Sequence, residues 1–144
     1  MKVEIFNLCD YASSDMSGKM TMVGVFDSVY VRNIPILIMY CSLAVRVRFE
    51  KHEEGIKRLT AKIVDSDGLE IVPPTETIVQ VQVPPEWTTA TAQIVAMLPQ
   101  LQLPHFGEYL VVLDIDGRLE ATTPLYARQI PTTLPQFQIP QRPV

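Results

Sequence analysis

Histidine and cysteine are scarce in this sequence, which limits the chemistry that it can support. The 144 residues include two histidines and two cysteines. His52 lies in the polar stretch "EKHEEG" and His105 in "LPHFGEY", far along the chain from each other and from Cys9 and Cys41. Zinc sites usually contain closely spaced ligand pairs, and a catalytic nucleophile needs a base within hydrogen-bond reach. The sequence therefore predicts no metal centre, no cofactor and no enzyme of a familiar class.

Basic clusters and long apolar runs are also missing. The chain carries 12 Lys and Arg against 16 Asp and Glu, a formal net charge of -4, so it has no cationic field to hold the phosphates of a nucleic acid. Its longest apolar run, "IPILIMYC" at residues 34–41, is shorter than a membrane-spanning helix of about 20 residues. The opening stretch "MKVEIFNLCDYASS" lacks the apolar region of a secretory signal. We expect a soluble, cytoplasmic protein that binds neither nucleic acid nor membrane, with Cys9 and Cys41 buried and reduced.

Proline is abundant while glycine is scarce, with 12 Pro against 6 Gly. Because Pro is excluded from helix interiors and central strand positions, this number favours many short elements with irregular connections. The last residues, "PTTLPQFQIPQRPV", are especially rich in Pro. The sequence predicts one domain over residues 1–130 and an extended or disordered tail over residues 131–144. The "PQRP" of that tail also resembles a Pro-x-x-P ligand, an alternative that the sequence leaves open.

Alternation of apolar and polar residues is the clearest structural signal. In "CSLAVRVRFE" (41–50), every second residue is apolar, which places one set of side chains in a core and the other in water. The same pattern recurs in "RLTAKI" (58–63) and "TETIVQVQV" (75–83), whereas "EYLVVLDI" (108–115) is apolar on both faces. We therefore predict an all-β fold, an antiparallel two-sheet β-sandwich, immunoglobulin-like or similar, with about eight strands. The expected strands are residues 2–9, 19–33, 39–50, 57–65, 75–83, 91–98, 108–115 and 118–127.

One segment could form a helix instead of a strand. "TTATAQIVAMLPQLQ" contains helix-forming residues, but Pro99 would end the helix early and its Thr, Ile and Val residues dilute the helical propensity. The strand at residues 91–98 is the favoured interpretation.

The stretch "SSDMSGKMTMVGVFDSV" has a Gly-Lys pair ahead of a β-branched run, as a phosphate-binding loop would. Such a loop reads Gly-x-x-x-x-Gly-Lys-Ser/Thr, but Ser13 stands at the position of the first glycine and Met20 at that of the hydroxyl. The stretch instead predicts a hairpin loop in which Asp15 caps the backbone and Gly18 adopts a positive φ, and we expect no nucleotide to bind. Gly24, inside the following strand, predicts a bulge or a close backbone approach.

Aspartates gather in two short stretches, "DSDG" and "DIDG". Closely spaced carboxylates at loop tips can share a calcium ion, which makes Asp65, Asp67, Asp114 and Asp116 candidate metal ligands. Asp-Gly is also the preferred pair for tight hairpin turns, and neither loop has a further Asp placed to complete a coordination sphere. The turn is the favoured interpretation, and a β-sandwich that binds calcium or a small ligand through these loops stays the alternative.

Leu110 and Val112 give one strand an apolar outer face. Such a strand is central in its sheet, or its outer face is covered, and we expect cover by a homodimer or by the apolar residues of the tail. The leading hypothesis is thus a non-catalytic interaction or structural module whose partner is a protein, in the simplest form a second copy of the chain. An enzyme of unfamiliar design is the third hypothesis, and its polar set would be Asp10, Tyr11, Lys19 and Asp27.

The series "LCDYA", "GKMTMVGVFD", "IVDSDG", "LQLPHFGEYLVVLDIDG" and "TPLYA", in this order, resembles a bacterial family of uncharacterised small β-sandwich proteins, known as a domain of unknown function. The resemblance covers residues 1 to about 128 and excludes the Pro-rich tail. It implies a β-sandwich fold and provides no catalytic residue to transfer. Tyr109, just inside a strand, also resembles the corner tyrosine of immunoglobulin-like sandwiches.

Overall fold

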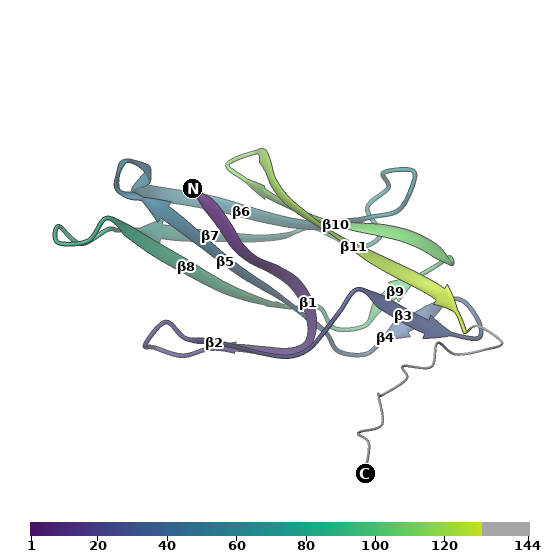
Figure 1. Ribbon diagram of the computed structural model, residues 1–144. Coiled ribbons are helices and arrows are strands. Elements are labelled where there is room, and N and C mark those ends of the chain that lie inside the picture. Colours follow the sequence, from purple (N-terminus) through teal and green to yellow (C-terminus); the bar gives the residue numbers. More distant parts are fainter. Residues whose placement is uncertain (131–144) are drawn as a thin grey trace, which may run out of the picture.

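The computed structural model describes residues 1–130, and the predicted tail lies outside them. The described chain forms eleven strands and one short 3-10 turn (Figure 1). They are β1 (Lys2–Ser14), β2 (Met20–Phe26), β3 (Ser28–Val31), β4 (Ile36–Ile38), β5 (Ser42–Glu50), η1 (Lys51–Glu53), β6 (Gly55–Val64), β7 (Thr75–Val81), β8 (Thr89–Met97), β9 (Leu101–Leu103), β10 (Gly107–Ile115) and β11 (Arg118–Gln129). No helix in this part of the chain is long and apolar enough to cross a membrane.

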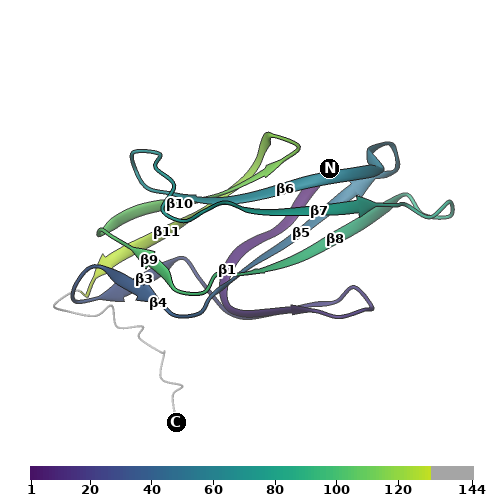
Figure 2. The same ribbon diagram turned by 180° about the vertical axis from the view of Figure 1, so that it is seen from behind.

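The strands form two large sheets and one small one (Figures 1 and 2). The order is β2-β1-β5-β8 in the four-stranded sheet and β3-β11-β10-β6-β7 in the five-stranded sheet, while β4 pairs with β9. Neighbouring strands run antiparallel, except that β3 runs parallel to β11. The predicted all-β, mainly antiparallel fold is confirmed. The expected number of strands was too low, because eleven strands form where eight were expected.

The extra strands have identifiable structural causes. The segment expected as one strand over residues 19–33 is broken at Asp27, whose main-chain oxygen accepts a hydrogen bond from Tyr126 N (2.7 Å). There the chain crosses from the four-stranded to the five-stranded sheet. β4 and β9 have three residues each, too few for alternation to be recognised. The segment that could have been a helix is strand β8.

The main core lies between the two large sheets. The inward residues that alternation predicted are buried, namely Cys41, Leu43, Val45, Val47 and Phe49 at β5 and Tyr109, Val111, Leu113 and Ile115 in β10. The Tyr109 hydroxyl donates to His105 O (2.8 Å) and accepts from His105 N (2.9 Å). This is the pattern of a corner tyrosine, which fastens the start of a strand to the loop before it.

The four-stranded sheet is curled. β1 pairs with β5 from Lys2 to Cys9, whereas its pairing with β2 runs from Leu8 to Ser14. The second half of β1 therefore leaves the sheet together with β2, and these residues, 10–26, form what we call the bent hairpin. It folds across the outer face of β5 and β8, where a second buried cluster contains Cys9, Ala12 and Ala44 with Ile5, Met20, Met22 and Val95 packed against them.

Gly24 lies at the bend of this hairpin, opposite Asp10. It has a φ of 66°, and a Cβ atom at this position would approach Asp10 Cγ to 2.8 Å and Asp10 Cβ to 3.2 Å. The expected close approach is therefore present, and the side chain that makes it is Asp10.

Candidate functional site

The Gly-Lys loop is a capped hairpin turn. Asp15 Oδ1 accepts hydrogen bonds from Ser17 N (2.9 Å), Lys19 N (3.0 Å) and Ser17 Oγ (2.6 Å), and Gly18 has the expected positive φ of 83°. The bond from the Ser17 hydroxyl, followed by that from the Lys19 backbone, lowers the pKa of Asp15 below its ordinary value. Two backbone N–H groups at the turn are therefore already bound to a carboxylate, which is the opposite of an anion-binding arrangement.

The aspartates of the first Asp-Gly loop hold a turn. Asp65 Oδ1 accepts from Asp67 N and Leu69 N, both at 2.9 Å, and the Gly68 N–H donates to Asp65 O (3.0 Å). These bonds form the local cap that Asp provides in turns. The Oδ1 atom of Asp65 thus accepts its hydrogen bonds from the backbone of its own loop.

The aspartates of the second loop contact neighbouring strands. Asp116 Oδ1 accepts from Arg58 N (2.9 Å), and Asp114 Oδ2 lies 3.0 Å from Lys62 Nζ. The two Asp loops lie at opposite ends of the β6–β10 pair, because Val64 pairs with Leu110 at one end and Leu59 with Ile115 at the other. The structure therefore does not bring the four candidate ligands together, and residues 1–130 contain no group of three His, Cys, Asp or Glu side chains that could hold a metal ion.

The polar set of the third hypothesis is also dispersed. Lys19 follows the turn at the tip of the bent hairpin, while Asp10 contacts Gly24 at its base. Tyr11 is 58% exposed. Asp27 lies at the crossing between the sheets and lines a shallow cavity with Asn7 and Thr123, which neither Asp10 nor Lys19 lines. These four side chains do not converge on one site.

The two thiols are buried and unpaired with each other. Cys9 is 0% and Cys41 3% exposed, and both are free. Burial raises the pKa of Cys41 to about 11, and burial is also the first cause of the raised pKa of Cys9. A thiolate is the reactive form, so we expect both cysteines to be unreactive packing residues.

Thiol labelling checks this placement. At neutral pH a maleimide should label Cys9 and Cys41 slowly in the folded protein and quickly after unfolding in guanidinium. As a control, Met16→Cys places a thiol at the exposed hairpin tip, and this third thiol should react at once. Rapid labelling of both native cysteines in the folded protein would contradict the burial of the two side chains.

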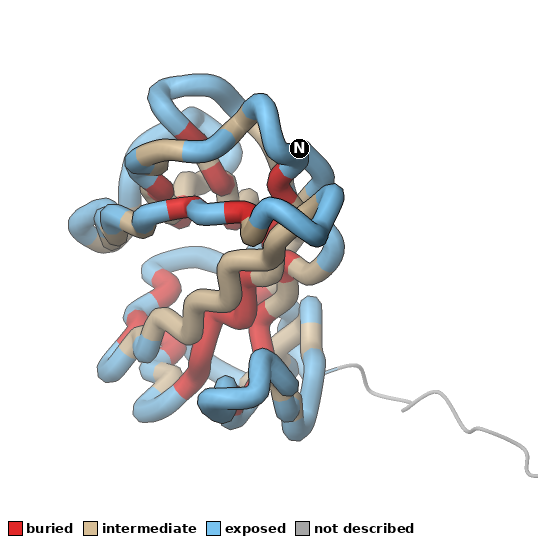
Figure 3. The backbone as a smooth tube through the Cα atoms, turned by 90° about the vertical axis from the view of Figure 1, so that its left-hand side faces the viewer, coloured by how far each residue is buried: buried red, intermediate tan, exposed pale blue. Residues whose placement is uncertain are grey.

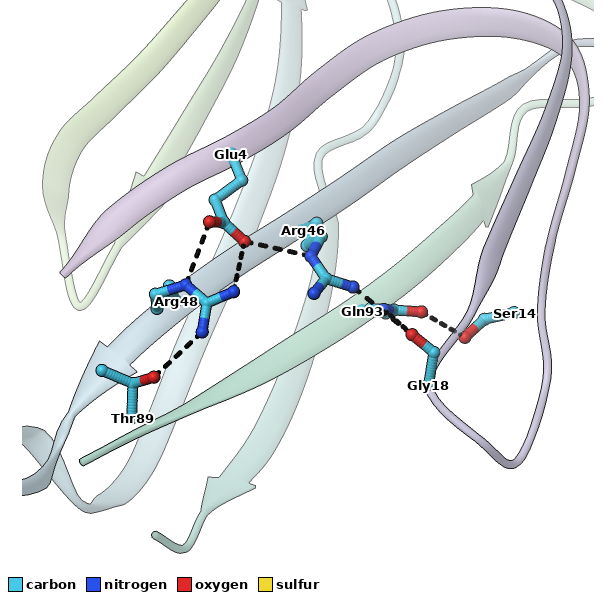
Figure 4. Close-up of polar contacts among 7 residues, drawn as sticks. All are labelled: Glu4, Ser14, Gly18, Arg46, Arg48, Thr89 and Gln93. Atoms are coloured by element: carbon cyan, nitrogen blue, oxygen red, sulfur yellow. Dashed lines mark hydrogen bonds and ion pairs between the residues drawn. The ribbon is translucent and has the colours of Figure 1, made fainter. Parts of the chain in front are cut away.

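A polar network covers part of the outer face of the four-stranded sheet (Figure 4). A register shift between Val3 and Ile5 of β1 brings the Glu4 carboxylate to Arg46 Nε and Arg48 Nε, each at 3.0 Å. The hydrogen bond from Arg48, followed by that from Arg46, lowers the pKa of Glu4. Alternation predicted that both arginines face outward, but the bulge that supplies their partner leaves no mark in the sequence.

The same network fastens the tip of the bent hairpin. Gly18 O accepts hydrogen bonds from Arg46 Nη1 (3.3 Å) and from Gln93 Nε2, and the Ser14 hydroxyl donates to Gln93 Oε1 (2.7 Å). Arg48 Nη1 in turn donates to Thr89 Oγ1 (2.9 Å). Both guanidinium groups are thus engaged within the chain, and the network supports the curl of the sheet.

The side of the molecule between β7 and β8 is open. Both strands lie at sheet edges, and a groove of about 350 Å³ runs between residues 79–82 and residues 90–93. Residues 89–96 of β8 are only half-buried, the long tan run in Figure 3, whereas their inward partners on β5 are buried. Short side chains contribute to the incomplete burial of β8, because Ala90, Ala92 and Ala96 lie on its inner face. We call this surface the open side.

The free edge of β8 is long, straight and uncharged. Its nine residues, "TATAQIVAM", include no charged residue and no Pro, and their pairing with β5 continues without a register shift from Thr89 to Met97. Proteins usually protect an edge strand with a charge, a Pro, a bulge or a cover. β8 has none of the first three.

Other apolar side chains are exposed elsewhere. Tyr11, Val23 and Val25 of the bent hairpin are 58%, 53% and 54% exposed. By contrast, Leu110 and Val112, which were expected to need cover, are already half-buried within the chain. The open side differs from the outer face of β10 because it combines a groove with two free strand edges, whereas β10 lies inside the five-stranded sheet.

Comparison with known proteins identifies a family. Residues 4–128 match the model of a protein family described as a family of unknown function (DUF6941). No curated protein matches the chain. The family match agrees with the resemblance that the sequence motifs indicated over residues 1 to about 128.

Proposed function

We propose that this chain, which belongs to this family of unknown function, is a non-catalytic module that binds protein, in the simplest form a second copy of itself. The observation that carries the proposal is the unprotected edge of β8 beside the open side. An edge strand presents a row of N–H and C=O groups that pair readily with another strand.

The other sheet edges are better protected, which supports the choice of β8. β2 belongs to the bent hairpin, whose pairing is interrupted at Gly24. β3 has four residues. β7 carries Glu76, which forms an ion pair with Arg58 at 3.1 Å. These are the devices that discourage pairing with another chain.

The polar side chains support a non-catalytic role. The carboxylates of the Asp loops hold turns and ion pairs, and the outer-face arginines are bound to Glu4 and Gly18. A catalytic site would need polar groups aimed at a common point. A cytoplasmic location, in which buried thiols stay reduced, and an immunoglobulin-like sandwich, which the bonds of Tyr109 support, are also part of the proposal.

Self-association tests the proposal. Light scattering on the full chain and on a chain of residues 1–130 should give twice the monomer mass for both, because the proposed surface lies within the described residues. The shortened chain keeps Ile130, whose N–H donates to Val31 O (3.0 Å). If the full chain is a monomer and only the shortened chain associates, residues 131–144 cover the surface and the proposed self-association is wrong.

A further inference from the structure

We propose that two copies of the chain pair through β8, antiparallel about a two-fold axis centred on Gln93, so that the four-stranded sheets become continuous. The inference rests on the proposed function and adds the surface, the partner and the register.

The backbone of β8 offers a defined set of free groups. Leu98 N donates to Cys41 O (2.9 Å) and Gln100 N to Met39 O (3.0 Å). Hydrogen-bonded pairs alternate along an antiparallel ladder, and the register between β5 and β8 has no shift. The same alternation therefore turns the main-chain groups of Ala90, Ala92, Ile94 and Ala96 toward β5. The N–H and C=O groups of Thr89, Thr91, Gln93, Val95 and Met97 are turned toward the free edge.

These free main-chain groups allow β8 of one copy to pair with β8 of a second copy. Bonded pairs across the interface must join two residues whose main-chain groups point outward. A pairing centred on Gln93 places Gln93 opposite the partner's Gln93 and Thr91 opposite the partner's Val95. Gln93 is also the midpoint of β8 (Thr89–Met97), so this register uses the whole strand. No like charges meet, because β8 carries no charge.

The same register fits the side chains on the inner face. Ala92 would lie opposite the partner's Ile94, and Ile94 opposite the partner's Ala92, so that at the centre of the interface a small side chain meets a large one, while Ala90 would lie opposite the partner's Ala96. Ala92 belongs to the lining of the groove on the open side, and Ile94 lines the interior beneath it. Cross-strand pairs of this kind are the unit of sheet stabilisation. Each copy would thus cover part of the other's open side.

A second copy is favoured over an unrelated peptide because the strand matches itself in both respects. Its outward main-chain groups match each other under a two-fold axis, and the central side chains Ala92 and Ile94 are complementary under the same axis. Two-fold association buries one surface against itself and closes without leaving a free edge at the contact.

Substitution at Thr91 tests the interface. Thr91→Pro removes an N–H that points to the free edge, and it removes no bond to β5. The dimer dissociation constant should rise about 100-fold or more, whereas the matched control Thr91→Val should change it by less than about threefold. Circular dichroism should show that both variants keep the strand content of the unsubstituted chain.

Disulfide cross-linking tests the register without relying on the proline variant. In an antiparallel bonded pair the Cα atoms are about 5.5 Å apart, within the range of a disulfide. Gln93→Cys should therefore form a covalent dimer under mild oxidation. Thr91→Cys should not, because in this register it lies opposite Val95 and far from its own copy. The buried Cys9 and Cys41 should not contribute.

The outcomes separate the two proposals. A dimer that survives Thr91→Pro, with no cross-link at Gln93→Cys, overturns the β8 interface and leaves the proposed function standing. Equal cross-linking at both positions overturns the centred register. An unsubstituted chain that stays monomeric with residues 131–144 present and removed overturns both the interface and the proposed self-association. If Thr91→Pro fails to fold, the comparison of cross-linking by Gln93→Cys and by Thr91→Cys tests the interface instead.

Discussion

Replacing Val47 by Asp is expected to unfold the domain. Val47 is 0% exposed and stands on β5, which lies inside the four-stranded sheet between β1 and β8. Its cross-strand neighbours on the inner face are Val3 and Ala92, and neither can form an ion pair. A carboxylate there would lose its water without gaining a partner. We expect a loss of more than about 4 kcal/mol, against a total stability of roughly 5–15 kcal/mol.

The matched control for this variant is Ile78→Asp. Ile78 is also a β-branched strand residue, but it is 59% exposed on the outer face of β7. Urea unfolding followed by circular dichroism should show a change of no more than about 1 kcal/mol for Ile78→Asp. If Val47→Asp keeps a cooperative transition near that of the unsubstituted chain, the two large sheets do not enclose this position.

The second large effect is expected at the bend of the hairpin. Gly24→Ala forces a residue with a Cβ atom into a φ of 66°, which costs about 1–2 kcal/mol. The new Cβ would also meet Asp10 Cγ at 2.8 Å, so the exposed Asp10 side chain must move aside, which adds to this loss. The total loss should be visible as a lower midpoint in urea unfolding.

Two further variants isolate the contact from the backbone strain. Gly18→Ala has a similar φ of 83°, but its Cβ would meet nothing within 4 Å, so it should lose only the strain. Adding Asp10→Ala to Gly24→Ala should recover part of the loss, because it removes the Asp10 carboxylate that the new Cβ would meet. Equal losses for Gly18→Ala and Gly24→Ala, with no recovery in the double variant, would show that Asp10 does not approach Gly24 closely.

Local sequence patterns identified strand faces and turns correctly. The inward residues of β5 and β10 are buried as alternation predicted, because that pattern records which side chains are withdrawn from water. The turn around Asp15 and Gly18 was also predictable, since a capping carboxylate and a positive φ depend on a few adjacent residues.

Features that depend on distant residues were not predictable. The bend of β1 after Cys9 follows from the packing of the hairpin on β5 and β8, and no residue of β1 marks it. The break at Asp27 arises because β2 and β3 belong to different sheets, and the polar pair Asp27 and Ser28 does not by itself indicate a change of sheet. Alternation describes faces within a strand and does not say which strand lies beside it.

The candidate surface could be only partly predicted for the same reason. Leu110 and Val112 indicated a strand that is central or covered, and β10 does lie inside the five-stranded sheet, with both residues half-buried. The segment that forms β8 was predicted to be a strand, but its edge position follows from the strand order. Its lack of charge and Pro was visible in the sequence and becomes informative only once that position is known.

The parallel pairing of β3 with β11 has a consequence for protein synthesis. Tyr126 pairs with Ser28 and Gln129 with Val31, so a strand made early must wait for one made almost a hundred residues later. While the ribosome is still adding β4 to β10, β3 has no neighbour in its own sheet, and the five-stranded sheet cannot be completed. Long-range pairing of this kind slows folding and prolongs the exposure of unpaired strands. Completion of the fold must therefore wait for the synthesis of β11, and until then β3 exposes an unpaired strand.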